Sequence, residues 1–138
     1  MTLEQQLASV PLLAGLEPRV RRRLAEVGKR RTYAAEQAIV REGTTGTALY
    51  IVLSGTARVE REGGERLGEL KTGDFFGELA LIEEHPRSAS VVAQTETECL
   101  LFPAWEFSAL MDEHPEIAVP IMKALIGRLH RREHHVPA

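Results

Sequence analysis

An acid and a base nine positions apart, Glu78 and Arg87, are the residues of this chain best suited to binding chemistry. A carboxylate accepts hydrogen bonds from sugar hydroxyls, whereas a guanidinium donates paired hydrogen bonds to phosphate oxygens. Gly77 precedes the acid and lets the backbone approach an anion closely. The apolar residues after it can form a short helical turn whose free N–H groups point at that anion. This combination predicts a site for a ligand that carries both a sugar and a negative charge.

The elements that must position this pair follow the order helix, strands, helices. Helical spacing of apolar residues predicts a first helix near 17–27, with Pro18 in its first turn and Gly28 at its end. Short β-rich runs punctuated by glycines cover about 30–102 and are typical of an antiparallel sandwich or barrel. Helical spacing returns over about 103–133 and predicts two C-terminal helices. The pattern indicates an α+β fold, and we expect residues 1–138 to form a single domain.

The stretch from Phe76 to Ala89 resembles the phosphate-binding cassette of the cyclic nucleotide-binding domain family. The family pattern reads Phe-Gly-Glu-Leu-Ala-Leu, a short spacer, then Pro-Arg-Ser/Thr/Ala-Ala, and this stretch matches it throughout. Three further segments match in order and spacing, so the resemblance covers about residues 10–132; they are Arg41–Gly43, Leu49–Gly55 and Thr72–Gly77. The resemblance implies an eight-stranded antiparallel β jelly roll, flanked by an N-terminal helix and two C-terminal helices.

The resemblance also implies a role for each residue of the cassette. Arg87 would bind the exocyclic phosphate oxygens and Glu78 the ribose 2′-hydroxyl, while nearby amides would hold the rest of the phosphate. The ligand-binding residues expected in this way are Gly77, Glu78, Leu79, Ala80, Arg87, Ser88, Ala89, Val59 and Leu67. The last two would line an apolar slot for the base, although both could equally be plain core residues. The interior of the roll is predicted to contain Leu49, Ile51, Leu53, Val59, Val91, Ala93 and Leu100.

The ligand implied is cyclic AMP (cAMP), with cyclic GMP (cGMP) as the alternative. Ser88 follows the arginine where cAMP binders of the family carry alanine or serine and many cGMP binders carry threonine. We therefore expect a regulatory module that signals to an effector protein. The alternative is a ligand-free interaction or scaffold domain that keeps the same fold.

Composition and the remaining polar residues argue against other functions. Seventeen Lys and Arg against 20 Asp and Glu give a net charge of −3, which does not favour nucleic acid or an anionic membrane. No apolar run is long enough for a membrane span, so we expect a cytoplasmic location. No nucleophile motif indicates an enzyme. We expect no metal site, because His130 and His134 lie near a chain end that would position ligands poorly. Cys99 is expected to be a small buried thiol.

The last helix is predicted to act both as a lid over the ligand and as a surface for homodimer formation. Its regular part should start or kink near Pro120, because a proline inside a helix removes a backbone hydrogen bond. The expected dimer seam is Ala118, Met122, Leu125 and Leu129, with Ile121 and Ile126 facing the β-roll. Packing of both faces on the domain's own core is the alternative, since so short a seam is weak. The arginines at positions 19 and 21–23 are expected to form the solvated face of the first helix.

Overall fold

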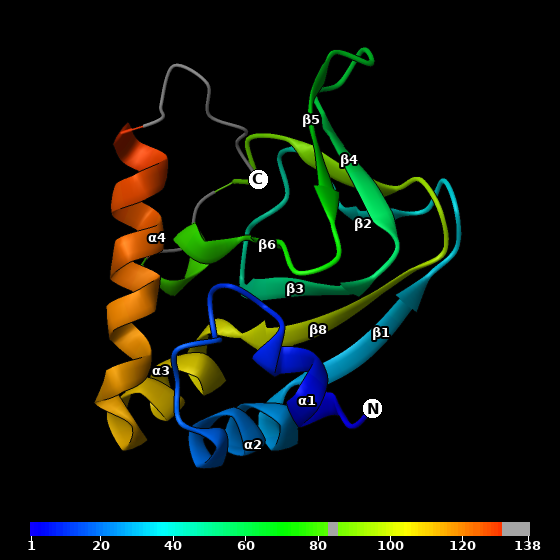
Figure 1. Ribbon diagram of the computed structural model, residues 1–138. Coiled ribbons are helices and arrows are strands. Elements are labelled where there is room, and N and C mark those ends of the chain that lie inside the picture. The colour runs from blue at the N-terminus through cyan, green and yellow to red at the C-terminus, as the bar shows by residue number, and fades with distance from the viewer. Residues whose placement is uncertain (83–85, 131–138) are drawn as a thin grey trace.

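The computed structural model describes residues 1–82 and 86–130, which form two four-stranded antiparallel sheets and a group of helices (Figure 1). The strands are β1 (Lys29–Tyr33), β2 (Ala38–Val40), β3 (Ala48–Ser54), β4 (Thr56–Glu60), β5 (Arg66–Lys71), β6 (Phe75–Phe76), β7 (Ser90–Ala93) and β8 (Thr97–Pro103). The helical elements are α1 (Leu3–Ala8), α2 (Pro18–Val27), η1 (Glu78–Leu81), α3 (Ala104–Glu113), η2 (Pro115–Ile117) and α4 (Ala118–His130). The eight-stranded jelly roll with its flanking helices is therefore confirmed.

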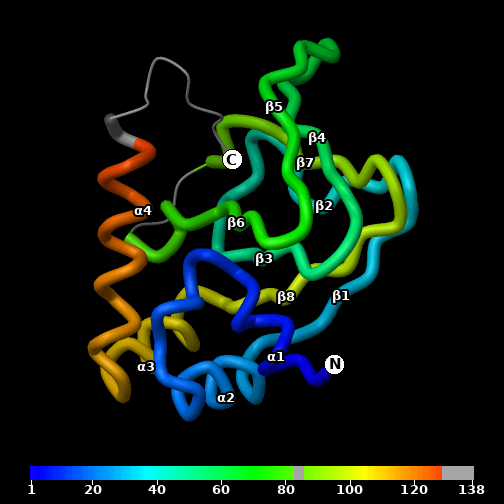
Figure 2. The backbone as a smooth tube through the Cα atoms, in the orientation of Figure 1, coloured from blue at the N-terminus to red at the C-terminus, as the bar shows by residue number. Residues whose placement is uncertain are grey.

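The strands of one sheet run in the order β1-β8-β3-β6, and those of the other in the order β2-β7-β4-β5. Each sheet thus combines strands that are far apart in the chain, as expected of a roll (Figure 2). Residues 61–65 form a hairpin tip that connects β4 to β5 through two glycines with left-handed backbones. The β-roll begins at Lys29 and ends at Pro103, within one residue of the expected bounds.

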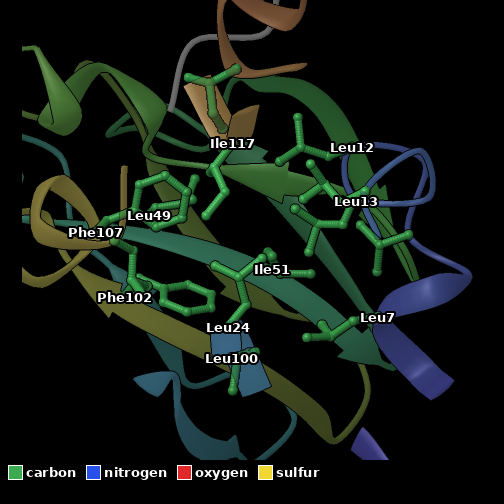
Figure 3. Close-up of a cluster of buried hydrophobic side chains, with 14 of the residues drawn as sticks. Leu7, Leu12, Leu13, Leu24, Leu49, Ile51, Leu100, Phe102, Phe107 and Ile117 are labelled. Carbon is green, nitrogen blue, oxygen red and sulfur yellow. The ribbon is translucent and has the colours of Figure 1, made fainter. Parts of the chain in front are cut away.

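Strand β3 is buried on both faces, which explains its unbroken apolar sequence. Leu49, Ile51 and Leu53 face a helix-side core, defined here as the buried cluster that also contains residues of α1 to α4 (Figure 3). The alternate residues of the strand, which include Tyr50 and Val52, face an inter-sheet core formed with the second sheet. All seven predicted interior residues are buried, and they divide between these two cores.

Helix α1 was not expected from the sequence. A capping box formed by Thr2 and Gln5 starts it, and its Leu7 is completely buried in the helix-side core. Arg21 of α2 pairs with Glu4 of α1 at 3.2 Å and donates to the carbonyl oxygens of Ala14 and Leu16. The prediction of a solvated face is therefore wrong for Arg21, whose side chain is 11% exposed and joins α2 to α1. It holds for Arg22, which is exposed, and for Arg19 and Arg23, whose side chains are 59% and 40% exposed.

Helix α4 begins at Ala118 after the short turn η2, so Pro120 lies in its first turn. Proline is tolerated there because the first N–H groups of a helix have no acceptor within it. The predicted start near Pro120 is confirmed, without an interior proline. The division of its apolar residues between a buried and an exposed face differs from the prediction. Ile121 is buried and Leu125 packs against the helix-side core, whereas Ile126, expected to face the β-roll, is 53% exposed.

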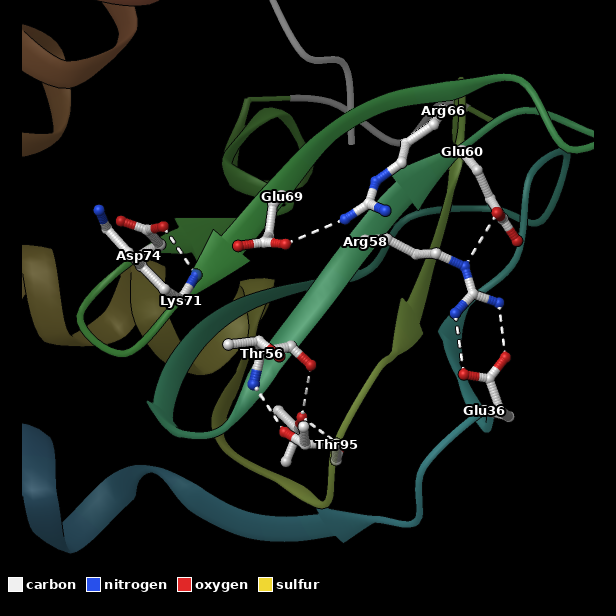
Figure 4. A network of polar contacts seen from close by, with 10 residues as sticks. Glu36, Thr56, Arg58, Glu60, Arg66, Glu69, Lys71, Asp74 and Thr95 are labelled. Carbon is white, nitrogen blue, oxygen red and sulfur yellow. Dashed lines mark hydrogen bonds and ion pairs between the residues drawn. The ribbon is translucent and has the colours of Figure 1, made fainter.

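The outer face of the second sheet is covered by charged side chains (Figure 4). Arg58 of β4 donates to both carboxylate oxygens of Glu36, at 2.8 and 3.0 Å, and to Glu60 at 3.0 Å. Arg66 and Glu69 form a further pair on β5. On β4 these charged residues alternate with the buried Ala57 and Val59, so this strand has one face in the inter-sheet core and one face outside it.

Candidate functional site

Arg87 lies in the loop between η1 and β7, and its backbone is held by the loop between β2 and β3. Its N–H donates to the carbonyl oxygen of Thr44 at 2.7 Å, and its own carbonyl accepts from the N–H of Gly43 at 2.8 Å. Pro86 forms a bridge with Thr45. The residues matched as Arg41–Gly43 in the sequence therefore lead directly into the segment that positions Arg87.

The guanidinium of Arg87 is buried, and no carboxylate of the described residues pairs with it. The residue is 4% exposed, and no acidic side chain of residues 1–82 and 86–130 lies within ion-pair distance of it. One donor, Nη2, bonds to the carbonyl oxygen of Ala48 at 3.0 Å, which leaves most of its five N–H groups for another acceptor. Burial lowers the pKa of Arg87 from its ordinary value, and the negative charge of Glu78 opposes this shift. A buried cation of this kind favours an anionic ligand.

Two glycines make room for this guanidinium. A Cβ atom added at Gly46 would lie 2.8 Å from Cζ of Arg87, and one added at Gly77 would lie 2.8 Å from its Nη1. Gly77 also has a φ of 82°, in the left-handed region that other residues rarely adopt. Its importance was expected from the sequence, whereas that of Gly46 was not.

Glu78 is the first residue of η1 and is also buried, with 3% of its surface exposed. Its Oε1 accepts a hydrogen bond from Nη1 of Arg128 at 2.6 Å. Its Oε2 is buried and has no hydrogen-bond partner in the part of the chain that the structure describes. A buried carboxylate oxygen without a donor is costly, so this atom indicates where a hydroxyl of a ligand would bind.

Arg128 connects the C-terminal part of α4 to the start of the cassette. Besides Glu78, it donates through Nη2 to the carbonyl oxygen of Phe75 at 2.7 Å. Its Cζ lies 4.3 Å from the centre of the Phe75 ring, close enough for a cation–π contact. Arg128 was not identified from the sequence, because 50 positions separate it from Glu78.

The other cassette residues differ in exposure. Ala80 and Ala89 are buried, whereas Ser88 is exposed and Leu79 is 39% exposed. The N–H of Ala80 donates to the carbonyl of Gly77 at 3.1 Å, so a phosphate would have to share this donor. The N–H groups of Glu78 and Leu79 lie in the first turn of η1, where the turn itself supplies no acceptor. These two N–H groups are the donors of the turn best suited to a phosphate, and their contact with one remains a prediction.

The two residues expected to line the slot for the base differ in how deeply they are buried. Val59 is completely buried in the inter-sheet core, and Leu67 on β5 is only partly buried against it. Both belong to neighbouring strands of one sheet. Their contact with a base remains a prediction.

Other polar clusters do not form a second site in the described part of the chain. No group of three or more His, Cys, Asp or Glu residues there is arranged to hold a metal ion, and His134 lies outside the described residues. Cys99 is buried, as expected, and burial raises the pKa of its thiol to about 12. No described helix is long and apolar enough to cross a membrane.

Comparisons with known proteins agree with this geometry. A family model described as cyclic nucleotide-binding domain matches residues 30–114. A cAMP-dependent protein kinase regulatory subunit from Emericella nidulans is 43% identical over 94 residues, which are 67% of this chain and 23% of that protein. Glutaminase 2 from Bradyrhizobium diazoefficiens is 35% identical over 126 residues, which are 91% of this chain and 20% of that protein.

The crystal structure of the catabolite activator protein from Thermus thermophilus is similar with a TM-score of 0.82 and 35% sequence identity. The similarity covers 89% of this chain and 60% of that one. The chain thus spans less than a quarter of the length of the two curated relatives named above.

Proposed function

Because the chain belongs to the cyclic nucleotide-binding domain family, we propose that it is a regulatory module that binds cAMP between Arg87 and Glu78. The observation that carries this proposal concerns two buried side chains of the described residues. The guanidinium of Arg87 forms no ion pair there, and Oε2 of Glu78 has no hydrogen-bond donor there. The guanidinium suits the single negative charge of a cyclic phosphodiester, and Oε2 of Glu78 suits the 2′-hydroxyl of its ribose. The name of the Emericella nidulans relative supports cAMP as the nucleotide.

Calorimetric titration of the protein with cAMP and cGMP tests this proposal. We expect saturable binding of both, with cAMP binding more tightly, because Ser88 matches the residue that cAMP binders of the family carry. The hydroxyl of Ser88 can still bond the amino group of guanine, so the expected preference is modest. A preference of about tenfold or more for cGMP, which is about 1.4 kcal/mol, would reverse the assignment of the base.

We propose that α4 carries the signal, because its Arg128 bonds the same carboxylate that would receive the ribose. Among the described residues of the site, the two positive charges of Arg87 and Arg128 exceed the single negative charge of Glu78, which favours a phosphate. A ligand that moves Glu78 would change its hydrogen bond with Arg128, and with it the packing of the last turns of α4. This contact gives the expected lid a physical link to the ligand.

We further propose that α4 forms a homodimer, through a seam shifted from the expected one. The exposed apolar residues are Val119, Met122 and Ile126, which are 44%, 53% and 53% exposed. Their spacing of three and four residues is that of coiled-coil contact positions. The proposed seam therefore contains Met122, as expected, and Ile126 in place of the expected Leu125. The side chain of Leu129 lies outside the described residues.

Sedimentation at high micromolar concentration, with and without saturating cAMP, tests the dimer and its link to the ligand. We expect concentration-dependent association that changes with cAMP and is lost in Met122→Glu, because a charge in the seam must be desolvated. The exposed neighbour Lys123 provides the matched variant Lys123→Glu, which should associate as the parent does. A monomer in both ligand states would reject the seam.

The alternative, a scaffold domain without a ligand, would be supported if titration showed no binding of either nucleotide. An effector protein and a cytoplasmic location remain predictions. So does the absence of catalysis, since the similarity to Glutaminase 2 covers a fifth of that protein's length. We propose in addition that residues 1–138 form one domain, because α1, α2, α3 and α4 share the helix-side core.

A further inference from the structure

Gly46, in the loop between β2 and β3, lies directly against the guanidinium of Arg87. A Cβ added there would lie 2.8 Å from Cζ, 2.9 Å from Nε and 3.1 Å from Nη1 of the arginine. Atoms in protein interiors are close-packed and do not tolerate such overlap, so one of the two groups would have to move. Gly46 therefore forms part of the wall that places the guanidinium.

The rest of that wall also comes from backbone groups. Gly77 is close to Nη1 and Nη2, because a Cβ there would lie 2.8 and 3.3 Å from them. The carbonyl oxygen of Ala48 accepts from Nη2 at 3.0 Å. Since no described carboxylate pairs with Arg87, the position of its charge depends on these three neighbours.

Gly46 differs from Gly77 in the reason why a glycine is needed. Gly77 has a left-handed backbone, so a side chain would strain the chain itself. The backbone of Gly46 is outside that region, and any residue could adopt it. The atoms that would clash are the far end of a long, flexible side chain, which can swing away at little cost to folding. A side chain at Gly46 would therefore harm the position of Arg87 much more than the stability of the protein.

We propose that Gly46 is a positioning residue of the phosphate site, whose missing side chain keeps the guanidinium of Arg87 in place to receive a cyclic phosphate. The inference rests on the proposed function and deepens it. Binding through several directed hydrogen bonds requires the donors to lie within about 0.5 Å of their productive positions, and a displaced guanidinium loses that geometry.

The variant Gly46→Ala tests this inference by calorimetric titration with cAMP. We expect affinity to fall about tenfold or more, while the midpoint of thermal unfolding stays at that of the parent. The matched control is Gly15→Ala, because a Cβ at Gly15 has no neighbour within 4 Å and its backbone is not left-handed. Gly15→Ala should bind as the parent does, and Gly46→Ala binding equally tightly would overturn the proposal.

A second pair of variants separates positioning of Arg87 from a general effect on the loop. If Gly46 acts through the guanidinium, adding Gly46→Ala to Arg87→Ala should cause no further loss of affinity. A further loss in the double variant would show that Gly46 affects binding by another route, and would also overturn the inference.

A readout without ligand keeps this inference distinct from the proposed function. The Nε–H resonance of Arg87 in the free protein should shift in Gly46→Ala and not in Gly15→Ala, because only the former displaces the guanidinium. An unchanged resonance contradicts the packing argument whether or not cAMP binds. Failure of the parent protein to bind cAMP would instead remove the proposed function, and with it the role of Gly46 towards a ligand.

Discussion

Replacing Arg87 with alanine is expected to weaken cAMP binding about 30-fold to several thousand-fold, or by roughly 2–5 kcal/mol. The reason is that Arg87 is a buried cation, and among the described residues its guanidinium bonds only to the carbonyl oxygen of Ala48. Its removal would leave the phosphate desolvated without its main donor. Calorimetric titration of the variant with cAMP measures the loss. Affinity equal to that of the parent would exclude Arg87 from the phosphate site.

Two variants provide controls for this experiment. Arg66→Ala removes an arginine whose side chain is 52% exposed and paired with Glu69, so affinity for cAMP should not change. Arg87→Lys keeps the charge but loses the planar set of donors, so we expect it to recover only part of the lost affinity. Thermal unfolding should show all three variants folded at the temperature of the titration.

The largest effect on stability is expected from Gly55→Ala, at the tight turn between β3 and β4. Gly55 has a φ of 91°, and an added Cβ would contact the carbonyl oxygen of Glu96 and lie 2.7 Å from Oγ1 of Thr97. Thr97 is buried and its hydroxyl donates to the carbonyl of Thr56 at 3.0 Å, so neither neighbour can move freely. We expect the free energy of unfolding to fall by about 2–4 kcal/mol, from backbone strain and overpacking together.

Denaturant unfolding of Gly55→Ala beside Gly63→Ala separates the two contributions. Gly63 has a nearly identical φ of 94°, but a Cβ there has no neighbour within 4 Å. Its replacement should cost about 1 kcal/mol, which is the strain alone. Equal losses in the two variants would show that the packing around Gly55 contributes nothing.

Much of the fold and part of the site could be predicted because the relevant signals are local. The alternate apolar residues Leu49, Ile51 and Leu53 predict an interior face of β3, and the structure buries all three in the helix-side core. Gly77 and Glu78 are adjacent in the chain, so their shared place at the start of η1 follows from the sequence. Helix α1 spans only the six residues Leu3–Ala8, which is too short for helical spacing of apolar residues to predict it.

The exposed face of α4 could not be predicted for a different reason. Apolar residues occur all around this helix, so several stripes of similar character can be drawn on its surface. Packing of Ile121 and Leu125 against the helix-side core selects one face for the interior. That choice leaves Ile126 outside, although its residue type would suit either side.

The sequence by itself determined the order of the elements, the interior of the roll, and the acid and base that a sugar phosphate would require. Only the tertiary structure decided that Arg87 pairs with no carboxylate of the described residues, that Gly46 borders its guanidinium, and that Arg128 bonds Glu78. The physical reason is the range of the interactions. The spacing of residues in a sequence predicts contacts within one turn, helix or strand. The contacts of Arg87 and Glu78 join segments about 40–50 positions apart, so they form only when the roll and α4 pack together.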